Sequence, residues 1–393
     1  MFASLTPGDQ LENVFWYRGI LSMNFIVAYR LEYHIFGPQR ISHVLRIFGE
    51  REAKLPIDKV FALVGIAKRY DTDLKQLVDY RIKSDETVLL DLAIFLFDHE
   101  EAFEILYLAG IGRGGRNPNL PSWVVDWTMQ CANTPLNSEF LPEALRYRAA
   151  TSKPLRAMRG TSQREIIVRG QLFDKITGLV PLHTNVTGRE SFTDIHLLLG
   201  SYLDETLKLA REKSRDPYPH AVNQSLDEAV WRTLIGDKTN TERPAPASYA
   251  HILARLNQGF ADLKDPLSRY FPELRFSEVT KENIRNGNAQ IEMEKLLASM
   301  ESIEQMQNID ILFDSGKGSS PYVFCVTAQG FIGMVPQLSQ VEDSIVLLHG
   351  MEVPYLLRGG DVKWRYQLVG DAYVHGIMDG EGVSGDGEDF TLV

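Results

Sequence analysis

Residues Pro321 to Pro336 read PYVFCVTAQGFIGMVP, and this stretch decides the fold class. Two runs rich in Val, Phe and Ile flank a turn signal that ends in Gly330, which is typical of paired β-strands. Short apolar runs separated by glycines continue from there to Ile377. Their closely spaced pattern of five strands predicts a small antiparallel meander or barrel over residues 321–380.

Helical patterns precede this region. Gln39–Phe48 is amphipathic, Asp58–Ile66 is a compact apolar run, and Ser84 is suited to cap a helix with acidic residues in its first turn. We therefore predict a helical domain over residues 1–130. The expected buried stripe of the helix after Ser84 is Val88, Leu92, Phe95 and Leu96.

The middle of the chain predicts a change of structure. Arg164 to Val180 alternates and is rich in Ile, Val and Leu, which favours a strand, a turn and a second strand. We assign residues 131–190 to a linker plus this strand pair, which joins the C-terminal sheet. Residues 191–310 form a helical region, with breaks at Pro244, Pro246 and Asn286–Asn288, and residues 381–393 a flexible acidic tail. The predicted fold class is α+β.

Composition narrows the functional classes. The 393 residues are 44% apolar and 24% charged, as in folded proteins, and the formal net charge is −11. A nucleic-acid partner is not expected, because such binders need a basic face. The two cysteines and nine histidines show no metal-ligand spacing, so we expect no metal and no cofactor.

The N-terminal residues are apolar but do not predict a membrane span. The longest uncharged run, Gly19 to Tyr29, is shorter than the roughly 20 residues that a bilayer helix needs. Met1 to Gln10 lacks a basic region and a cleavage site, so we expect no signal peptide and a cytoplasmic protein. The pattern favours a buried helix that Thr6 caps.

Two glycine-rich segments resemble nucleotide-binding loops only in part. Gly110, Gly112 and Gly115 satisfy G-x-G-x-x-G, but a helical pattern precedes them and Asn117–Pro118 follows, whereas the dinucleotide fingerprint needs a strand and then a helix. Residues 314–320, DSGKGSS, lack the first glycine of a phosphate-binding loop. We interpret the second segment as a connector.

A basic run offers a binding hypothesis. Between Arg146 and Arg169 seven basic residues meet one acid, Glu165. They would suit an anionic ligand or a phosphate group. The alternative is a solvated loop that offsets an acidic surface.

The last predicted strand carries the candidate catalytic residues. Period-two alternation places Asp371, Tyr373 and His375 on one face. Three such groups can perform acid–base chemistry if that face lines a cavity. The alternative is the solvated face of an antiparallel sheet.

The candidate ligand-binding residues are aromatic, with one acid. Trp123 and Trp127 lie four residues apart around Asp126, and they would form either the wall of an apolar pocket or part of the core. Trp16 and Tyr17 would suit the same pocket.

Several segments resemble fungal heterokaryon-incompatibility (HET) proteins. Arg51–Ala67 (REAKLPIDKVFALVGIA), Val78–Phe97 and Leu120–Thr128 (LPSWVVDWT) are similar to consecutive signatures of that family. Near the end, Val326–Gly333 and Tyr366–Glu381 (YQLVGDAYVHGIMDGE) resemble its closing motifs. Residues 1–50 do not contain the family's DALCINQ-type motif. The resemblance therefore implies the C-terminal region of a HET protein without the N-terminal effector domain, which is associated with cell death.

Two functional hypotheses follow, from different classes. In the first, the chain is a recognition or regulatory module that binds an apolar small molecule or a protein partner. In the second, it is a cofactor-independent enzyme of fungal secondary metabolism, such as a cyclase, isomerase or pericyclase (a Diels–Alderase, for example), which folds an apolar substrate into a reactive conformer. A closed apolar cavity with convergent polar groups would favour the enzyme.

Overall fold

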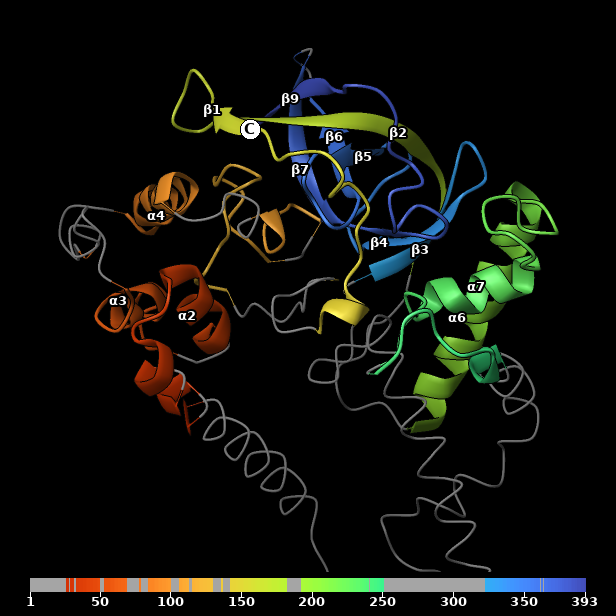
Figure 1. Cartoon of the computed structure of the whole chain (residues 1–393), viewed down its shortest axis with the longest axis horizontal. Helices are drawn as coiled ribbons and strands as arrows, with labels where there is room; N and C mark the ends of the chain where they lie inside the picture. Colours follow the sequence, from red (N-terminus) through yellow and green to blue (C-terminus); the bar gives the residue numbers. More distant parts are fainter. Residues whose placement is uncertain are drawn as a thin grey trace, which may run out of the picture. The chain divides into compact units, whose positions relative to one another are not determined.

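The computed structural model divides into two compact units, residues 1–105 with 126–131 and residues 106–125 with 132–393 (Figure 1). It describes residues 26–49, 53–68, 84–99, 106–129, 142–181, 192–250 and 322–393, together with Val78 and Leu136. Within these ranges residues 28, 32, 113, 114, 240, 361 and 363 are not described. The two units are described separately below.

The first unit contains the helices that the sequence predicts near its start. They are α2 (Ile41–Phe48), α3 (Asp58–Val64) and α4 (Asp85–His99). The predicted cap of α4 is confirmed, because the hydroxyl oxygen of Ser84 accepts a hydrogen bond from the backbone N–H of Thr87 at 3.3 Å. The predicted stripe is also buried: Val88, Leu92, Phe95 and Leu96.

The expectation of a buried helix near the N-terminus is wrong for the part of it that the structure describes. The described residues between 26 and 36 are helical, but only Tyr29 among them is buried. The ring of Tyr29 packs edge-on against Phe48 with centroids 5.3 Å apart. The other apolar side chains of this helix that the structure describes are exposed: Ile26, Val27, Leu31, Tyr33, Ile35 and Phe36. Thr6 lies outside the described residues.

The second unit is built on one mostly antiparallel sheet. Its strands are β1 (Ala157–Arg159), β2 (Ile166–Val180), β3 (Tyr322–Thr327), β4 (Ile332–Pro336), β5 (Ser344–Leu348), β6 (Tyr355–Gly359), β7 (Arg365–Asp371), β8 (Tyr373–Val374) and β9 (Glu388–Leu392). Their order is β5-β6-β7-β9-β2-β3-β4-β8, with β1 beside β2. The α+β fold class and the predicted C-terminal sheet are confirmed, although the described part of residues 321–380 holds six strands, β3 to β8, and not the five expected.

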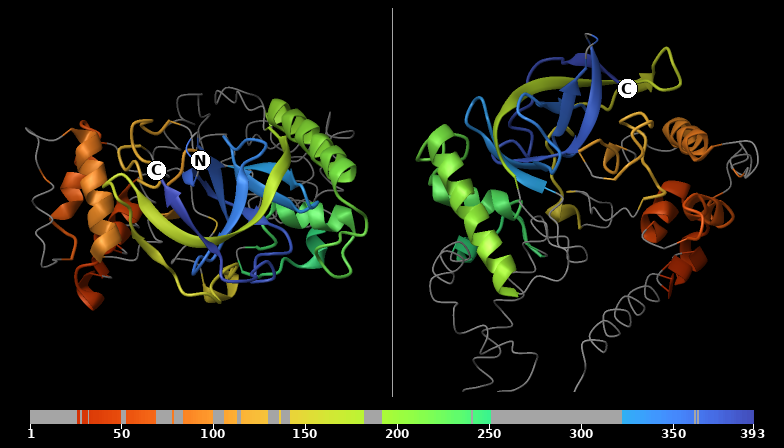
Figure 2. Two further views of the ribbon diagram at one scale, coloured as in Figure 1. Left: turned by 90° about the horizontal axis from the view of Figure 1, so that it is seen from above. Right: turned by 180° about the vertical axis from the view of Figure 1, so that it is seen from behind.

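The strand β2 closes part of this sheet into a barrel. Its residues Ile166–Gly170 pair with β9, and Gly170–Lys175 pair with β5. Since β5, β6, β7 and β9 are neighbours in that order, the path returns to β2. The short parallel pairing of β7 with β9 completes the ring. The far end of β2 leaves the ring and pairs with β3. Figure 2 shows β2 as the long curved strand across the barrel.

The predicted strand pair near residues 164–180 is a single strand of 15 residues. Two shifts in register, between Leu172 and Asp174 and between Ile176 and Gly178, bend the strand without ending it. A β-bulge adds one residue and increases the local twist, so one strand can serve two differently oriented parts of a sheet. β2 therefore continues as one strand where the sequence analysis expects a turn.

The predicted flexible acidic tail is also wrong, because residues 388–392 form β9. Phe390 and Leu392 are buried in the barrel. The side chain of Arg169 holds the preceding loop: it donates to the carbonyls of Asp386 and Gly387 at 3.0 and 2.9 Å and forms an ion pair with Asp389 at 2.9 Å. Acidic residues and glycines are typical of a frayed end. Here the alternating pattern of a strand buries the side chains of Phe390 and Leu392, and that burial stabilises the segment.

Helices pack on the β3–β4 side of the barrel. α6 (Phe192–Lys213) contacts β2 and β3, and α7 (Leu226–Leu234) contacts β4 and α6. Short 3-10 turns lie at Glu143–Leu145 and Ala247–Ala250. The helical prediction for 191–310 is confirmed for α6 and α7, whereas residues 251–310, with the expected break at Asn286–Asn288, lie outside the described residues.

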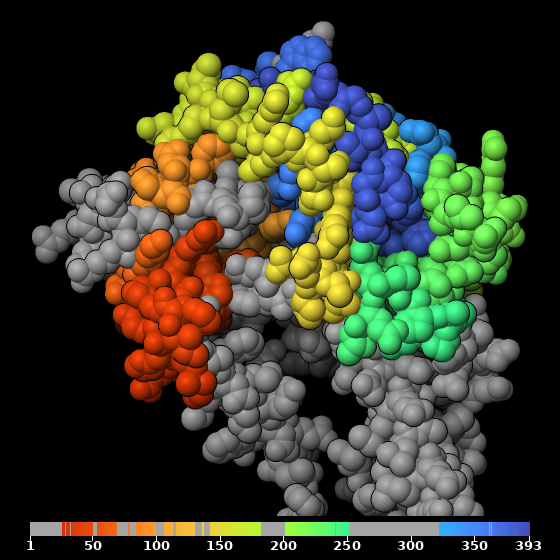
Figure 3. All heavy atoms as spheres, in the orientation of Figure 1, coloured from red at the N-terminus to blue at the C-terminus, as the bar shows by residue number. Residues whose placement is uncertain are grey.

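The segment before β1 also packs on the barrel, as the yellow atoms against the blue ones show (Figure 3). The backbone N–H groups of Arg148, Ala149 and Ala150 donate to carbonyls at residues 378, 352 and 351. Among the described residues of the whole chain, no helix is long and apolar enough to cross a bilayer.

Candidate functional site

Asp371, Tyr373 and His375 are buried. The alternative that they lie on the solvated face of an antiparallel sheet is therefore wrong. Their exposed fractions are 0, 2 and 3%. Asp371 accepts hydrogen bonds from the hydroxyl of Tyr322 at 2.8 Å and from the backbone N–H of Leu136 at 3.1 Å. Both partners are protein groups, and together they satisfy a carboxylate that burial would otherwise penalise heavily.

Tyr373 and His375 form a second chain of hydrogen bonds. The Tyr373 hydroxyl lies 2.7 Å from Nδ1 of His375, and Nε2 of His375 lies 2.7 Å from the side-chain oxygen of Gln224. Burial, helped by the charge of Arg232, lowers the pKa of His375 to about 3. The imidazole is therefore neutral at pH 7, and the chain is satisfied when Tyr373 donates to Nδ1 and Nε2–H donates to Gln224. Period-two alternation predicts all three residues on one face. In the structure Tyr373 and His375 bond to each other, whereas Asp371 bonds to Tyr322 and Leu136 instead.

A group of residues that the sequence analysis missed lies beside Tyr373. The ring of Tyr147 lies 5.6 Å from that of Tyr373, and both Lys238 and Arg243 lie over the Tyr147 ring, at 4.7 and 4.5 Å. Burial lowers the pKa of Lys238 to about 8. Arg243 is paired with Asp379 at 2.6 Å. No motif joins positions so far apart in the sequence, so spacing could not reveal them.

The aromatic candidates have separate positions. In the second unit Trp123 is buried, and its indole N–H donates to the carbonyl of Arg164 at 3.0 Å. In the first unit Trp127 is buried, and Asp126 accepts from the backbone N–H and hydroxyl of Thr128 at 3.1 and 2.5 Å. These contacts are those of core and turn residues. Trp16 and Tyr17 lie outside the described residues.

The glycines of the G-x-G-x-x-G pattern bring a loop against β7. The N–H groups of Ile111 and Gly112 donate to the carbonyls of Leu368 and Val369 at 2.9 and 2.8 Å. A Cβ added at Gly112 would lie 2.6 Å from Cβ of Pro336, and one at Gly110 would lie 2.3 Å from the Val369 carbonyl oxygen. Close backbone packing therefore explains both glycines, without a nucleotide.

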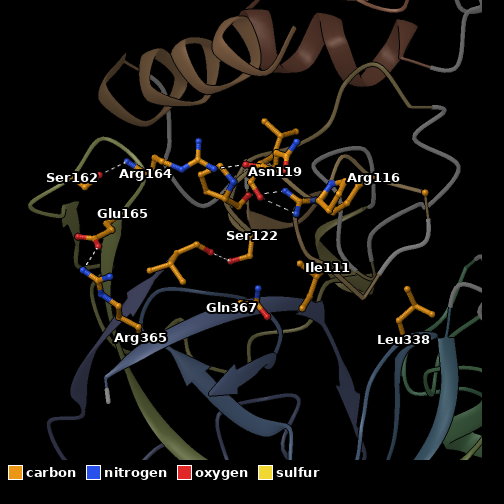
Figure 4. Close-up of a pocket in the computed structure, with 15 residues that line it drawn as sticks. Ile111, Arg116, Asn119, Ser122, Ser162, Arg164, Glu165, Leu338, Arg365 and Gln367 are labelled. Carbon is orange, nitrogen blue, oxygen red and sulfur yellow. Dashed lines mark hydrogen bonds and ion pairs between the residues drawn. The ribbon is translucent and has the colours of Figure 1, made fainter. Parts of the chain in front are cut away.

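This loop and the barrel line an open pocket of about 600 Å³ (Figure 4). Ser122 fixes its floor: the Ser122 hydroxyl accepts from the N–H of Leu368 at 2.8 Å and donates to the carbonyl of Val393. The residues that line the pocket are Ile111, Gly115, Arg116, Pro118, Asn119, Leu120, Pro121, Ser122, Ser162, Arg164, Glu165, Leu338, Arg365, Gln367 and Val393. All of them belong to the second unit.

Three arginines and one glutamate give this pocket a positive balance. Arg116 donates to the carbonyls of Leu120, Pro121 and Val124 at 3.2, 2.6 and 3.1 Å, which holds the loop in shape. Arg365 forms an ion pair with Glu165 at 2.6 Å, and its side chain remains 48% exposed. The basic residues between Arg146 and Arg169 thus do not act as one group. Arg164 lines this pocket, whereas Arg169 holds the loop before β9.

A second hollow, of about 550 Å³, lies in the loop of residues 216–225. Gln224 is in its lining, so this hollow reaches the outer end of the chain of hydrogen bonds from His375. No group of three or more His, Cys, Asp or Glu side chains within the described residues is arranged to hold a metal ion.

The architecture is that of a β-barrel domain with helices packed on one side and a pocket at the loop that packs on β7. The Het-6 beta-barrel domain family matches residues 167–393, and the chain belongs to this family. It is similar to heterokaryon incompatibility protein 6, OR allele, from Neurospora crassa, with 25% identity over 375 residues. The match covers 86% of this chain and 50% of that protein, so the chain spans about half the length of its relative. No solved structure matches.

Proposed function

We propose that this chain is a recognition module of a heterokaryon-incompatibility system and that it binds its ligand or partner group in the pocket between the 111–122 loop and β7. The observation that carries the proposal is the pocket itself. Its volume of about 600 Å³ is in the range of ligand sites in proteins, and loops held on a rigid scaffold are a common place for such sites.

Family membership supplies the biological context. The Neurospora crassa relative is a heterokaryon incompatibility protein by name, and this chain shares the barrel that defines the family. Incompatibility requires that a cell distinguish its own components from those of a fusion partner. A barrel with a shaped polar pocket is suited to that distinction, because placed polar groups give specificity.

The buried polar network has a structural role in this proposal; by this name we mean two separate hydrogen-bonded sets, Asp371 with Tyr322 and Tyr373 with His375 and Gln224. Each named side chain is bonded to another protein group. A substrate would have to displace these bonds to reach the three candidate catalytic groups. For that reason we favour binding at the pocket over a cofactor-independent cyclase, isomerase or pericyclase.

The test is to fill the pocket without altering the network. Leu338 lines the pocket and is 48% exposed, so a Leu338→Trp variant adds bulk there at little cost in folding. Val341 is similarly exposed and does not line it, so Val341→Trp is the matched control. Each version is expressed in Neurospora crassa, and the fraction of viable heterokaryons is counted after strains are paired.

The wild-type chain is expected to change that fraction several-fold, and Leu338→Trp is expected to remove the change while Val341→Trp keeps it. A wild-type chain with no effect on heterokaryon viability would contradict the role in incompatibility. An effect that Leu338→Trp leaves intact would contradict the role of the pocket.

A further inference from the structure

We propose that the pocket selects a small amphiphilic anion, with a carboxylate or phosphate group at the Arg365 end and a short apolar body toward Ile111 and Leu338. This inference rests on the proposed function, and it names the chemical class that the pocket binds.

The pocket has two chemically different ends. Ser162, Arg164, Glu165 and Arg365 gather at one end in Figure 4. Ile111 and Leu338 lie toward the other end, which also holds Arg116, whose guanidinium donates to backbone carbonyls. A ligand with one charged and one apolar end matches this separation, because it leaves no buried polar group unpaired and no apolar surface in water.

Arg365 already recognises a carboxylate. Its Nη2 group lies 2.6 Å from Oε1 of Glu165, and Glu165 is held in place because its other oxygen accepts from the hydroxyl of Thr161 at 3.0 Å. A guanidinium carries five N–H donors on three nitrogens, whereas this ion pair uses one nitrogen. The remaining donors fit a second carboxylate or a phosphate group, for which Arg is the preferred residue.

Local charge also favours an anion. The pocket residues include three arginines against one glutamate, although the chain as a whole carries −11. A positive pocket on an acidic protein attracts an anion locally and leaves nucleic acid, which needs an extended basic face, disfavoured. Arg116 contributes charge while its donors stay on backbone carbonyls, so Arg365 is the group that we assign to the ligand.

The test compares four probes that share one apolar chain. Octanoate, octyl phosphate, octanol and octylamine are titrated into the full chain by calorimetry below their micelle concentrations. We expect octanoate or octyl phosphate to bind at least tenfold more tightly than octanol, and octylamine not to bind. Which of the two anions binds more tightly identifies the head group.

Variants assign the binding to Arg365. Arg365→Gln is expected to weaken binding of the anionic probe by about tenfold or more. Arg211→Gln is the control, because Arg211 forms a surface ion pair with Asp227 on the helices, away from the pocket lining. Equal binding of octanol and the anions, an unchanged affinity in Arg365→Gln, or no binding of any probe would overturn the proposal. If the anions do not bind but Leu338→Trp still removes the effect on heterokaryons, the proposed function stands and only the ligand class is wrong.

Discussion

The buried polar network and the pocket between the 111–122 loop and β7 differ in how their polar groups are placed. The polar groups of the network bond to one another inside the protein, whereas those of the pocket are accessible from outside. In the network, His375 is 3% exposed and both ring nitrogens have side-chain partners. In the pocket, the Arg365 side chain is 48% exposed and faces a hollow. Sequence motifs drew attention to the first region, whereas the geometry of the second is suited to bind a ligand.

The largest expected difference between the two regions is in stability. Asp371→Ala removes the acceptor of two buried donors, the Tyr322 hydroxyl and the Leu136 N–H. Because each donor left unpaired costs about 1–3 kcal/mol, the free energy of unfolding should fall by about 3 kcal/mol or more. Urea denaturation followed by circular dichroism measures this change.

The control for that variant is Asp227→Ala, which breaks an exposed ion pair on α7. Its effect should stay within about 1 kcal/mol. If Asp371→Ala were no more destabilising than Asp227→Ala, the network would not have the structural role that we assign to it.

The glycines of the pocket loop should give a smaller effect. Gly112→Ala places a Cβ 2.6 Å from Pro336, and such overpacking costs about 1–3 kcal/mol. Gly359→Ala is the matched control, since nothing lies within 4 Å of its added Cβ. Thermal unfolding of the two variants compares them. Similar melting temperatures would show that the loop does not pack on β7 as described.

The pH dependence of stability tests the network more finely. The pKa of His375 is lowered to about 3 in the folded chain, against an ordinary value near 6.5 in the unfolded chain. Between these pH values the unfolded chain binds the extra proton, so folding stability falls as the pH falls, by up to about 1.4 kcal/mol per unit. His375→Gln should flatten this part of the curve. Urea titrations from pH 7 to pH 4 measure it, and an unchanged slope in the variant would argue that His375 is not buried as described.

The smallest effect on stability is expected in the pocket. Arg365→Gln removes an ion pair whose arginine is half exposed but whose partner, Glu165, is only 8% exposed. Because the Thr161 hydroxyl still donates to Glu165, the free energy of unfolding should fall by about 1 kcal/mol, the low end of the cost of an unpaired buried acceptor. Chemical denaturation at low and high salt measures this difference. A loss as large as that of Asp371→Ala would mean that Arg365 holds the fold and is not available to a ligand.

The sequence was informative wherever a local rule applies. The Ser84 cap, the buried stripe of α4 and the C-terminal strands follow from side-chain chemistry within a few residues. β2 was misjudged because the sequence pattern alone does not distinguish a bulge within one strand from a turn between two strands. β9 was misjudged because the acidic composition concealed the burial of Phe390 and Leu392.

The pocket could not be predicted for a different physical reason. It forms where the 111–122 loop meets residues 162–165, Leu338, β7 and Val393, which are up to 282 positions apart in the chain (393 − 111). Period-two alternation does place Tyr373 and His375 on one face, since they are two residues apart. It does not predict that Gln224 bonds to His375. Only the closed barrel brings such distant segments side by side.

We propose that recognition occurs at the pocket while the buried polar network stabilises the barrel. The most direct measurement compares Leu338→Trp with His375→Gln in the heterokaryon assay, at equal protein levels and with melting temperatures recorded. We predict that Leu338→Trp melts like the wild type and has lost its effect on heterokaryon viability, whereas His375→Gln melts lower and retains the effect. The opposite pattern, a folded His375→Gln variant without effect and an active Leu338→Trp variant, would contradict the account.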